Sequence, residues 1–318
     1  MNILSSGMLC VALVLAACTQ SSLKSSQVLN LKDCGEIQNL EPLFEAEIPR
    51  VIVIDEGHGM QEPPAFVEAL LCHSLARGFT TNLALEVSDD KGLYKTYLQT
   101  QGKTDDKLAL FDDWAWKGEF TDGRSSEAML RLIDKARSYM LTGQNLSFTA
   151  FKADNLKQEN FADRSAYMQA YEKKMAENIL VSAQSAQKTI VLVGNLHARR
   201  YRYERGSSSY ELMAKHMPAP YTSSFFIVHK GGTAWNCRGP KPKDCKQHKS
   251  GAYVSADDEL ARTDIPTFIF NDNEEKIKPF IGRQYEKEWY DGVIYVGGVT
   301  ASPPANAAGR IPYVEDIK

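Results

Sequence analysis

Carboxylate and histidine side chains follow several short apolar runs of this chain, and two of them form the motif Glu56-Gly57-His58. One such motif is a weak indication of function, since a lone histidine near a strand is usually a hydrogen-bonded structural residue. Here the same side-chain types recur after further apolar runs, which favours a functional cluster. The candidate catalytic or metal-ligating residues are Glu56, His58, Glu86 and His197. Such groups can hold a divalent ion such as Zn²⁺ or Mn²⁺, or deprotonate water without a metal.

The apolar runs themselves predict buried β-strands. They are Val51–Ile54, Leu83–Leu85 with Val87, Leu146–Ala150 and Ile190–Val193. Helical patterns separate them, from Pro63 to about Arg77, from Ser125 to Met140 and from Phe161 to Leu180. This alternation predicts an α/β fold whose sheet is mainly parallel, with helices on both faces. Ligands bind at the carboxyl ends of such strands, so we expect the four candidates to form one site.

Three further residues are candidates for substrate binding. Asp154 follows the third predicted strand, although an aspartate there often only caps a turn. Arg124 and Arg164 lie near the starts of predicted helices, which place them at the same edge of the sheet. Arg164 also falls on an apolar stripe, where a charge must be paired. Each arginine could form a salt bridge with a candidate carboxylate or clamp an anionic substrate.

The N-terminus has the features of a bacterial lipoprotein signal. Met8–Ala17 is an apolar run of 10 residues, about half the length of a transmembrane helix and typical of a secretory h-region. Leu15-Ala16-Ala17-Cys18 resembles a lipobox. We therefore predict that residues 1–17 are removed, that Cys18 is lipidated, and that the protein is exported and anchored to a membrane of the cell envelope. Residues 18–45 would form a tether and lead-in.

Four cysteines then remain, and an oxidising compartment favours disulfides. Cys237 and Cys245 flank a short polar loop, so closing it costs little entropy, and we predict that they pair. The pairing of Cys34 and Cys72 stays open. A zinc site is disfavoured because no CxxC spacing is present. The basic residues around this loop predict a solvated surface; they are Arg238, Lys241, Lys243, Lys246 and Lys249.

Length and charge restrict the function classes further. The chain has 318 residues and a formal net charge of −3, with 43% hydrophobic and 24% charged residues. These values are ordinary for a globular protein and argue against a nucleic-acid binder, which needs a basic surface. The alternating pattern assigns residues 46–230 to an α/β domain. Residues 231–318 read as a loop-rich extension with a few strands, packed on the same domain.

The motifs resemble those of the superfamily that contains ChaN, TraB, the Tiki proteases and the erythromycin esterases. The resemblance covers residues 50–200 and rests on the two motifs Glu56-Gly57-His58-Gly59 and Gly194-Asn195-Leu196-His197. Further matches, typical of the ChaN-type lipoprotein branch, are Leu85-Glu86, Asp122-Gly123-Arg124-Ser125-Ser126, Asp163-Arg164 and Met175-Ala176-Glu177-Asn178. Asp55 stands where the superfamily usually has glycine.

The resemblance implies two different classes of function. The ChaN branch implies a lipoprotein that binds haem or iron, although no haem ligand can be transferred onto the matching positions. The Tiki and erythromycin-esterase branches imply a hydrolase, a peptidase or an esterase, which activates water with or without a metal. Glu56, His58, Glu86 and His197 would be its metal ligands or general bases. The partner is then a small-molecule or peptide ligand.

Overall fold

The structure, a computed structural model, describes residues 28–45, 50–100, 110–111, 116, 122–239, 241–253, 266–270 and 288–305. The predicted signal peptide, the lipobox with Cys18 and the first part of the tether lie outside these residues. Within the described part of the chain, no helix combines the length and apolarity needed to cross a membrane.

An eight-stranded sheet forms the centre of the molecule, in the order β1-β11-β12-β8-β2-β5-β3-β4. Its strands are β1 (Ile37–Gln38), β2 (Val51–Glu56), β3 (Thr81–Leu85), β4 (Leu146–Ala150), β5 (Lys188–Gly194), β8 (Thr222–Val228), β11 (Thr267–Phe270) and β12 (Gly292–Tyr295). Only β1 pairs antiparallel; the other neighbours are parallel. The predicted mainly parallel α/β fold is confirmed, and the C-terminal strands β11 and β12 join the same sheet.

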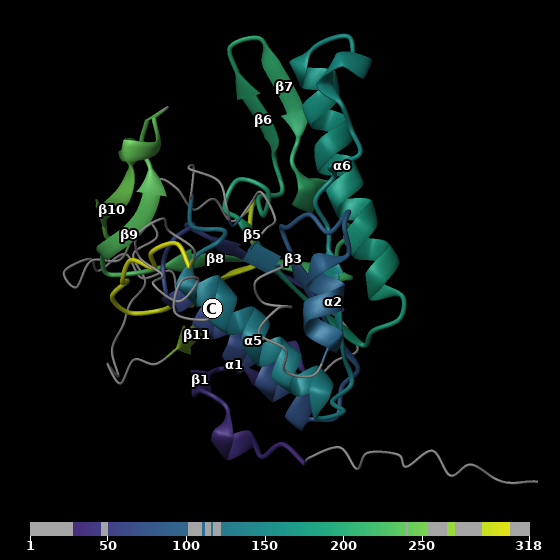
Figure 1. The fold of residues 1–318 in the computed structure, drawn as a ribbon, viewed down its shortest axis with the longest axis vertical. Coiled ribbons are helices and arrows are strands. Elements are labelled where there is room, and N and C mark those ends of the chain that lie inside the picture. The colour runs from purple at the N-terminus through teal and green to yellow at the C-terminus, as the bar shows by residue number, and fades with distance from the viewer. Residues whose placement is uncertain are drawn as a thin grey trace, which may run out of the picture.

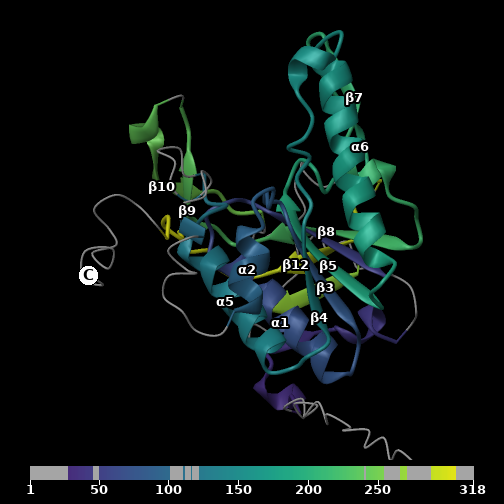
Figure 2. The ribbon, with the colours of Figure 1, turned by 45° about the vertical axis from the view of Figure 1, so that its right-hand side comes forward.

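Helices cover both faces of this sheet (Figure 1 and Figure 2). They are α1 (Glu62–Ala76), α2 (Leu93–Gln99), α5 (Glu127–Leu141) and α6 (Arg164–Ala183). Side chains alternate along each strand, so Ile52 and Ile54 of β2 enter the core under α1, α2 and α5. Val51 and Val53 enter a second core that includes residues of α6. A strand buried on both faces explains the continuous β-branched run in the sequence.

Side-chain caps decide where two predicted helices begin. The hydroxyl of Ser126 accepts a hydrogen bond from the backbone N–H of Met129 and starts α5 where expected. The carboxylate of Asp163 accepts from the N–H of Ala166 at 2.8 Å. This cap delays α6 to Arg164, beyond the predicted start at Phe161, because the capping residue itself is non-helical.

Two antiparallel hairpins stand apart from the main sheet. They are β6 (Arg202–Arg205) with β7 (Ser208–Glu211), and β9 (Gly232–Cys237) with β10 (Cys245–Ser250). The basic residues of the second hairpin are exposed, as predicted. Arg238, Lys241 and Lys243 lie in the loop between β9 and β10, as predicted, whereas Lys246 and Lys249 lie on β10 itself. The short helical turns are Leu31–Asp33, Glu41–Leu43, Gln158–Asn160, Met213–His216 and Pro242–Asp244.

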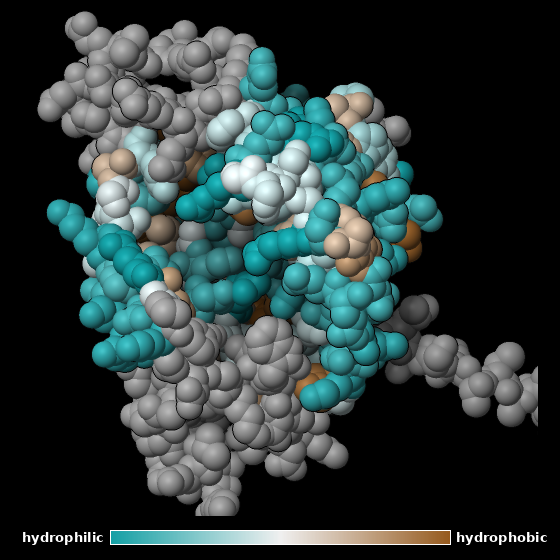
Figure 3. Space-filling view, turned by 90° about the horizontal axis from the view of Figure 1, so that it is seen from above, coloured by the Kyte–Doolittle hydropathy of each residue, from teal (hydrophilic) through white to brown (hydrophobic). Residues whose placement is uncertain are grey.

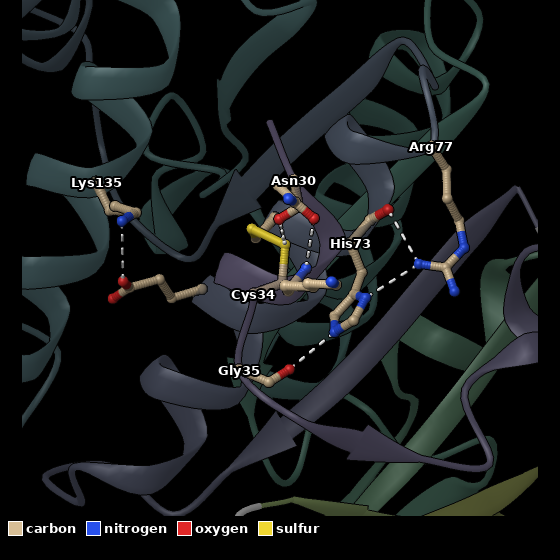
Figure 4. Close-up of a disulfide and its surroundings, with 9 residues drawn as sticks. Asn30, Cys34, Gly35, His73, Arg77 and Lys135 are labelled. Carbon is tan, nitrogen blue, oxygen red and sulfur yellow. Dashed lines mark hydrogen bonds and ion pairs between the residues drawn. A yellow bond between two sulfur atoms is a disulfide. The ribbon is translucent and has the colours of Figure 1, made fainter. Parts of the chain in front are cut away.

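Two disulfides close loops of different length. Cys237 pairs with Cys245, as predicted, and joins the ends of β9 and β10. Cys34 pairs with Cys72, which the sequence left open, and ties the N-terminal segment to α1. A further contact between the N-terminal segment and α1 lies beside the Cys34–Cys72 disulfide: Nε2 of His73 is 2.8 Å from the carbonyl oxygen of Gly35 (Figure 4). Disulfides are consistent with an exported protein.

We expect the Cys34–Cys72 disulfide to stabilise the fold more than the Cys237–Cys245 disulfide. The sequence separations are 38 and 8 residues, and in the chain-entropy model these loops correspond to about 4 and about 2.6 kcal/mol. Urea unfolding of Cys34→Ala/Cys72→Ala and Cys237→Ala/Cys245→Ala should therefore show the larger loss of unfolding free energy in the first double variant. The reverse order would contradict this expectation.

Candidate functional site

Glu56 and His58 form a hydrogen-bonded pair at the end of β2. The imidazole Nδ1 of His58 lies 2.8 Å from Oε1 of Glu56. The Glu56 carboxylate is 4% exposed and the His58 ring 22% exposed. A carboxylate at Nδ1 fixes both the orientation and the tautomer of the ring. The pair therefore leaves Nε2 of His58 as the nitrogen available for chemistry.

His197 is held in the same way by a carboxylate from α6. Both oxygens of Glu172 lie 2.9 Å from Nδ1 of His197. One of them also accepts a hydrogen bond from the backbone N–H of Met213 at 2.9 Å. Glu172 is fully buried, whereas His197 is 17% exposed. The candidate site thus contains two histidine–carboxylate pairs, each with Nδ1 of its ring beside a carboxylate.

Glu86 lies between these two pairs and connects the site to an arginine. Its Oε1 accepts a hydrogen bond from Arg124 at 2.8 Å, and its Oε2 accepts from the N–H of Gly194 at 3.0 Å. Arg124 also donates to Asp122 at 2.5 Å. Nε2 of His197 lies 3.8 Å from Oε1 of Glu86. The geometry selects the salt bridge to a candidate carboxylate as the role of Arg124.

A glycine lets His58 approach the same place. A Cβ added at Gly194 would lie 2.8 Å from Nε2 of His58 and 3.3 Å from Oε2 of Glu86. Only a residue without a side chain leaves room for both groups. The structure therefore brings Glu56, His58, Glu86 and His197 to one edge of the parallel sheet, where the topology predicts them to meet.

The carboxylates favour the protonated form of both imidazoles. Burial lowers the pKa of His58, but Glu56, Glu86 and Asp122 outweigh it and leave that pKa above its ordinary value. Burial likewise lowers the pKa of His197, but the hydrogen bond that its ring donates to Glu172, together with the charge of Glu86, raises this pKa overall. For Glu86, burial raises the pKa, but His197, His58 and Arg124 bring it below the usual range. A low pKa keeps Glu86 ionised between two imidazoles.

Two of the residues predicted to bind substrate, Arg164 and Asp154, do not contact the histidine–carboxylate pairs through any ion pair among the described residues. Arg164, the first residue of α6, is exposed, and no ion pair within the described residues engages it. The apolar stripe implied burial, but this end of α6 extends beyond the sheet beside the β6–β7 hairpin (Figure 1). Asp154 lies 3.9 Å from Nζ of Lys152, a contact outside the four central residues. Besides burial, the negative charges of Asp154 and Glu86 both raise the pKa of Tyr171.

Glu172 is the member of the site that the sequence analysis missed. It follows Tyr171 and precedes Met175 by one helical turn, so it lies next to the predicted apolar stripe of this helix. An acidic residue so close to a buried stripe needs a partner. The position of this acidic residue beside the apolar stripe therefore indicates a buried pair, and in the structure its partner is His197.

Asp55 points away from this cluster. The β2–β8 ladder ends at the pair Ile54 and Phe225, and beyond it Oδ1 of Asp55 accepts from the N–H of Ile227 at 2.7 Å. Oδ2 accepts from the hydroxyl of Tyr290 at 3.0 Å. Burial raises the pKa of Asp55 to about 7, against the lowering effect of these hydrogen bonds. The residue that replaces the superfamily's usual glycine therefore joins strands and does not obstruct the site.

Replacing Asp55 by asparagine should remove a pH dependence of stability. An unfolded aspartate loses its proton near pH 3.8, whereas the folded one keeps it to about pH 7. Folding therefore weakens as pH rises through this window, with a slope of about 1.4 kcal/mol per pH unit. An asparagine can still accept from Ile227 and donate to Tyr290. Urea unfolding of the wild type and Asp55→Asn from pH 4 to 7 should show the wild type losing stability relative to the variant. A constant difference would refute this assignment.

A metal does not fit this arrangement well. Within the described residues, no group of three or more His, Cys, Asp and Glu side chains is placed to hold a metal ion. Both Nδ1 atoms face carboxylates, and the two oxygens of Glu86 accept from Arg124 and Gly194. What the cluster offers is two Nε2 atoms beside an ionised carboxylate.

A hydrophilic hollow lies between the two hairpins (Figure 3). Figure 3 views the molecule along the direction in which both hairpins project, and polar residues line a depression between them. The partial exposure of His58 and His197 is consistent with access from this side.

Comparisons with known proteins show the fold. No protein-family model matches the chain, and no curated protein matches its sequence. A Bacillus cereus protein of solved structure is 14% identical, with a TM-score of 0.53 over 86% of this chain and 93% of that chain. A succinoglycan biosynthesis protein is 11% identical, with a TM-score of 0.54 over 84% and 92%. A mutant of the erythromycin esterase EreC in its open conformation is 13% identical, with a TM-score of 0.42 over 67% and 78%.

The first two of these similarities establish a shared fold.

Proposed function

We propose that this protein is a hydrolase of the ester or peptide class that activates water with two histidine–carboxylate pairs. The observation that carries the proposal is the placement of His58 and His197. Each Nδ1 is occupied by a buried carboxylate, and both rings border Glu86. A histidine oriented by a carboxylate is the usual arrangement of a general base or acid.

The two imidazoles take complementary roles in the proposed reaction. Nε2 of His58 accepts a proton from water while the water oxygen attacks the carbonyl carbon of the substrate. Glu56 stabilises the imidazolium that forms. The bond to the leaving group then breaks, and the leaving group takes a proton from Nε2 of His197. We assign the acid role to His197 because both oxygens of the fully buried Glu172 face its Nδ1, whereas a single oxygen of Glu56 faces Nδ1 of the more exposed His58.

Glu86 and Arg124 keep the charges of the site in balance. Arg124 fixes one oxygen of Glu86, and the backbone N–H of Gly194 fixes the other. The held carboxylate then faces both imidazoles and favours the protonated acid between turnovers. Its role in this scheme is that of a positioning residue.

The experiment is a hydrolysis screen with nitrophenyl esters and blocked peptides, run with EDTA and with added Zn²⁺ or Mn²⁺. Turnover in EDTA that disappears in His197→Asn supports the proposal. Turnover that requires the added ion would favour the metal-dependent version of the hydrolase. A parallel absorbance titration with haem tests the binding function that the ChaN resemblance implies. Absence of turnover together with saturable haem binding would overturn the hydrolase proposal.

We further propose that the protein is exported and lipid-anchored through Cys18. The lipobox-like residues before Cys18 and the two disulfides support this location. Cys18→Ser should abolish labelling by a fatty-acid probe and release the protein from the membrane fraction. Labelling that persists in Cys18→Ser, with Cys10→Ser as the matched control, would show that the anchor lies elsewhere.

A further inference from the structure

Two walls of different chemistry border the hollow above the catalytic edge. The β9–β10 hairpin rises on one side, and the N-terminal part of α6 rises with the β6–β7 hairpin on the other (Figure 1 and Figure 3). The catalytic cluster lies at the strand ends beneath them. What the walls present to a ligand indicates the class of substrate.

The first wall is a rigid cationic hairpin. Residues 232–253 contain five basic residues and one acidic residue, in a chain whose net charge is negative. The five cations are exposed, and within the described residues no ion pair neutralises any of them. They are Arg238, Lys241, Lys243, Lys246 and Lys249. Concentrated unpaired charge of one sign attracts a ligand of the other sign.

This hairpin is joined directly to the catalytic loop. The backbone N–H of Trp235 in β9 donates to the carbonyl oxygen of Gly59 at 2.9 Å. Gly59 follows His58, so the hairpin backbone lies one residue from the proposed base. The Cys237–Cys245 disulfide closes the same hairpin. The positive charge is therefore held in a fixed position at the rim of the site.

The second wall is a row of aromatic rings. The centroids of Phe161 and Tyr167 lie 5.7 Å apart, and those of Tyr167 and Tyr171 lie 5.9 Å apart. All three side chains are partly exposed. Burial raises the pKa of Tyr171, and the charges of Glu86 and Asp154 raise it further. Tyr171 is thus within electrostatic range of Glu86, and the row runs from Tyr171 through Tyr167 to Phe161 at the start of α6.

We propose that the substrate of this site is an ester or amide carried on an acidic polysaccharide. The apolar faces of sugar rings pack on aromatic side chains, which offer a large contact area at a small entropic cost. Their carboxylate groups pair with the cations across the hollow. A small neutral ester would use neither wall. The proposal rests on the proposed hydrolase function for its chemistry, but binding to the walls can be measured without turnover.

The test measures binding of four probes to the full-length His58→Ala variant at low salt. They are polygalacturonate, neutral dextran, poly-glutamate of matched charge, and anionic phosphatidylglycerol vesicles. We expect polygalacturonate to bind most tightly, poly-glutamate more weakly and dextran least. The affinity for polygalacturonate should fall steeply between 0.05 and 0.5 M salt, because salt screens exposed charges over about 10 Å at 0.1 M.

Variants separate the two walls. Lys246→Glu/Lys249→Glu should weaken polygalacturonate binding at least tenfold, whereas the control Lys32→Glu/Lys95→Glu, at exposed positions outside both walls, should not. Tyr167→Leu should weaken it by roughly 3- to 10-fold, and Tyr167→Phe should keep the wild-type affinity because it keeps the ring. Circular dichroism shows whether each variant is folded.

Equal affinity for polygalacturonate and poly-glutamate would overturn the role of the rings, and binding to vesicles alone would assign the hairpin to a membrane. Unchanged binding in Lys246→Glu/Lys249→Glu would overturn the role of the hairpin. If polygalacturonate binds but no ester or peptide is hydrolysed, the proposed hydrolase function is wrong and the proposed polysaccharide binding still stands.

Discussion

His58→Ala is expected to lower kcat for ester or peptide hydrolysis by about 10²- to 10⁴-fold, because it removes the general base. The fold should persist, since His58 lies in a strand-end loop and is partly exposed. Steady-state kinetics of the purified variant give the ratio directly.

The matched control is His73→Ala. His73 lies on α1, contacts the carbonyl oxygen of Gly35 near the Cys34–Cys72 disulfide (Figure 4), and is no part of the candidate site. Its loss should leave kcat within a factor of two or so of wild type. Equal losses in the two variants would mean that His58 acts only on the fold.

Gly59→Ala is expected to lower the free energy of unfolding strongly, and by more than Gly92→Ala. Gly59 has a φ of +81°, and a Cβ there would lie 1.8 Å from the carbonyl oxygen of Trp235. Side chains are disfavoured at this φ by about 1–2 kcal/mol, and the collision separates the catalytic loop from β9. We expect a total loss of about 3 kcal/mol or more, measured by urea unfolding.

Gly92→Ala is the control for this prediction. Gly92 also has a positive φ, +66°, but nothing lies within 4 Å of an added Cβ. This variant should lose only about 1–2 kcal/mol. Similar losses in Gly59→Ala and Gly92→Ala would show that the close approach of the hairpin to the catalytic loop is unimportant for stability.

The parallel sheet and the meeting of four candidate residues were predictable for a simple reason. Val51–Ile54 and Ile190–Val193 are apolar without alternation, which only strands buried on both faces require. Once the strands are parallel, their carboxyl ends share one edge. Glu56 and His197 are then neighbours by topology, with no need for information about side-chain contacts.

Other features depend on packing that a linear pattern does not encode. Glu172 lies next to the apolar stripe around the axis of α6. Whether its side chain faces His197 therefore depends on how α6 is rotated when it packs on the sheet. Arg164 shows the opposite case, because the end of α6 extends past the sheet and leaves it in solvent. The β6–β7 strands are only four residues each and mostly polar, so they give no strand signal.

The most direct test of a single catalytic unit is a double-mutant cycle on His58 and His197, with kcat/KM for the best hydrolysed substrate as the readout. We predict that kcat/KM of His58→Ala, of His197→Ala and of the double variant all fall to nearly the same residual value, because groups that act as a unit give non-additive losses. Losses that multiply in the double variant, or a His197→Ala variant with wild-type kcat/KM, would contradict it.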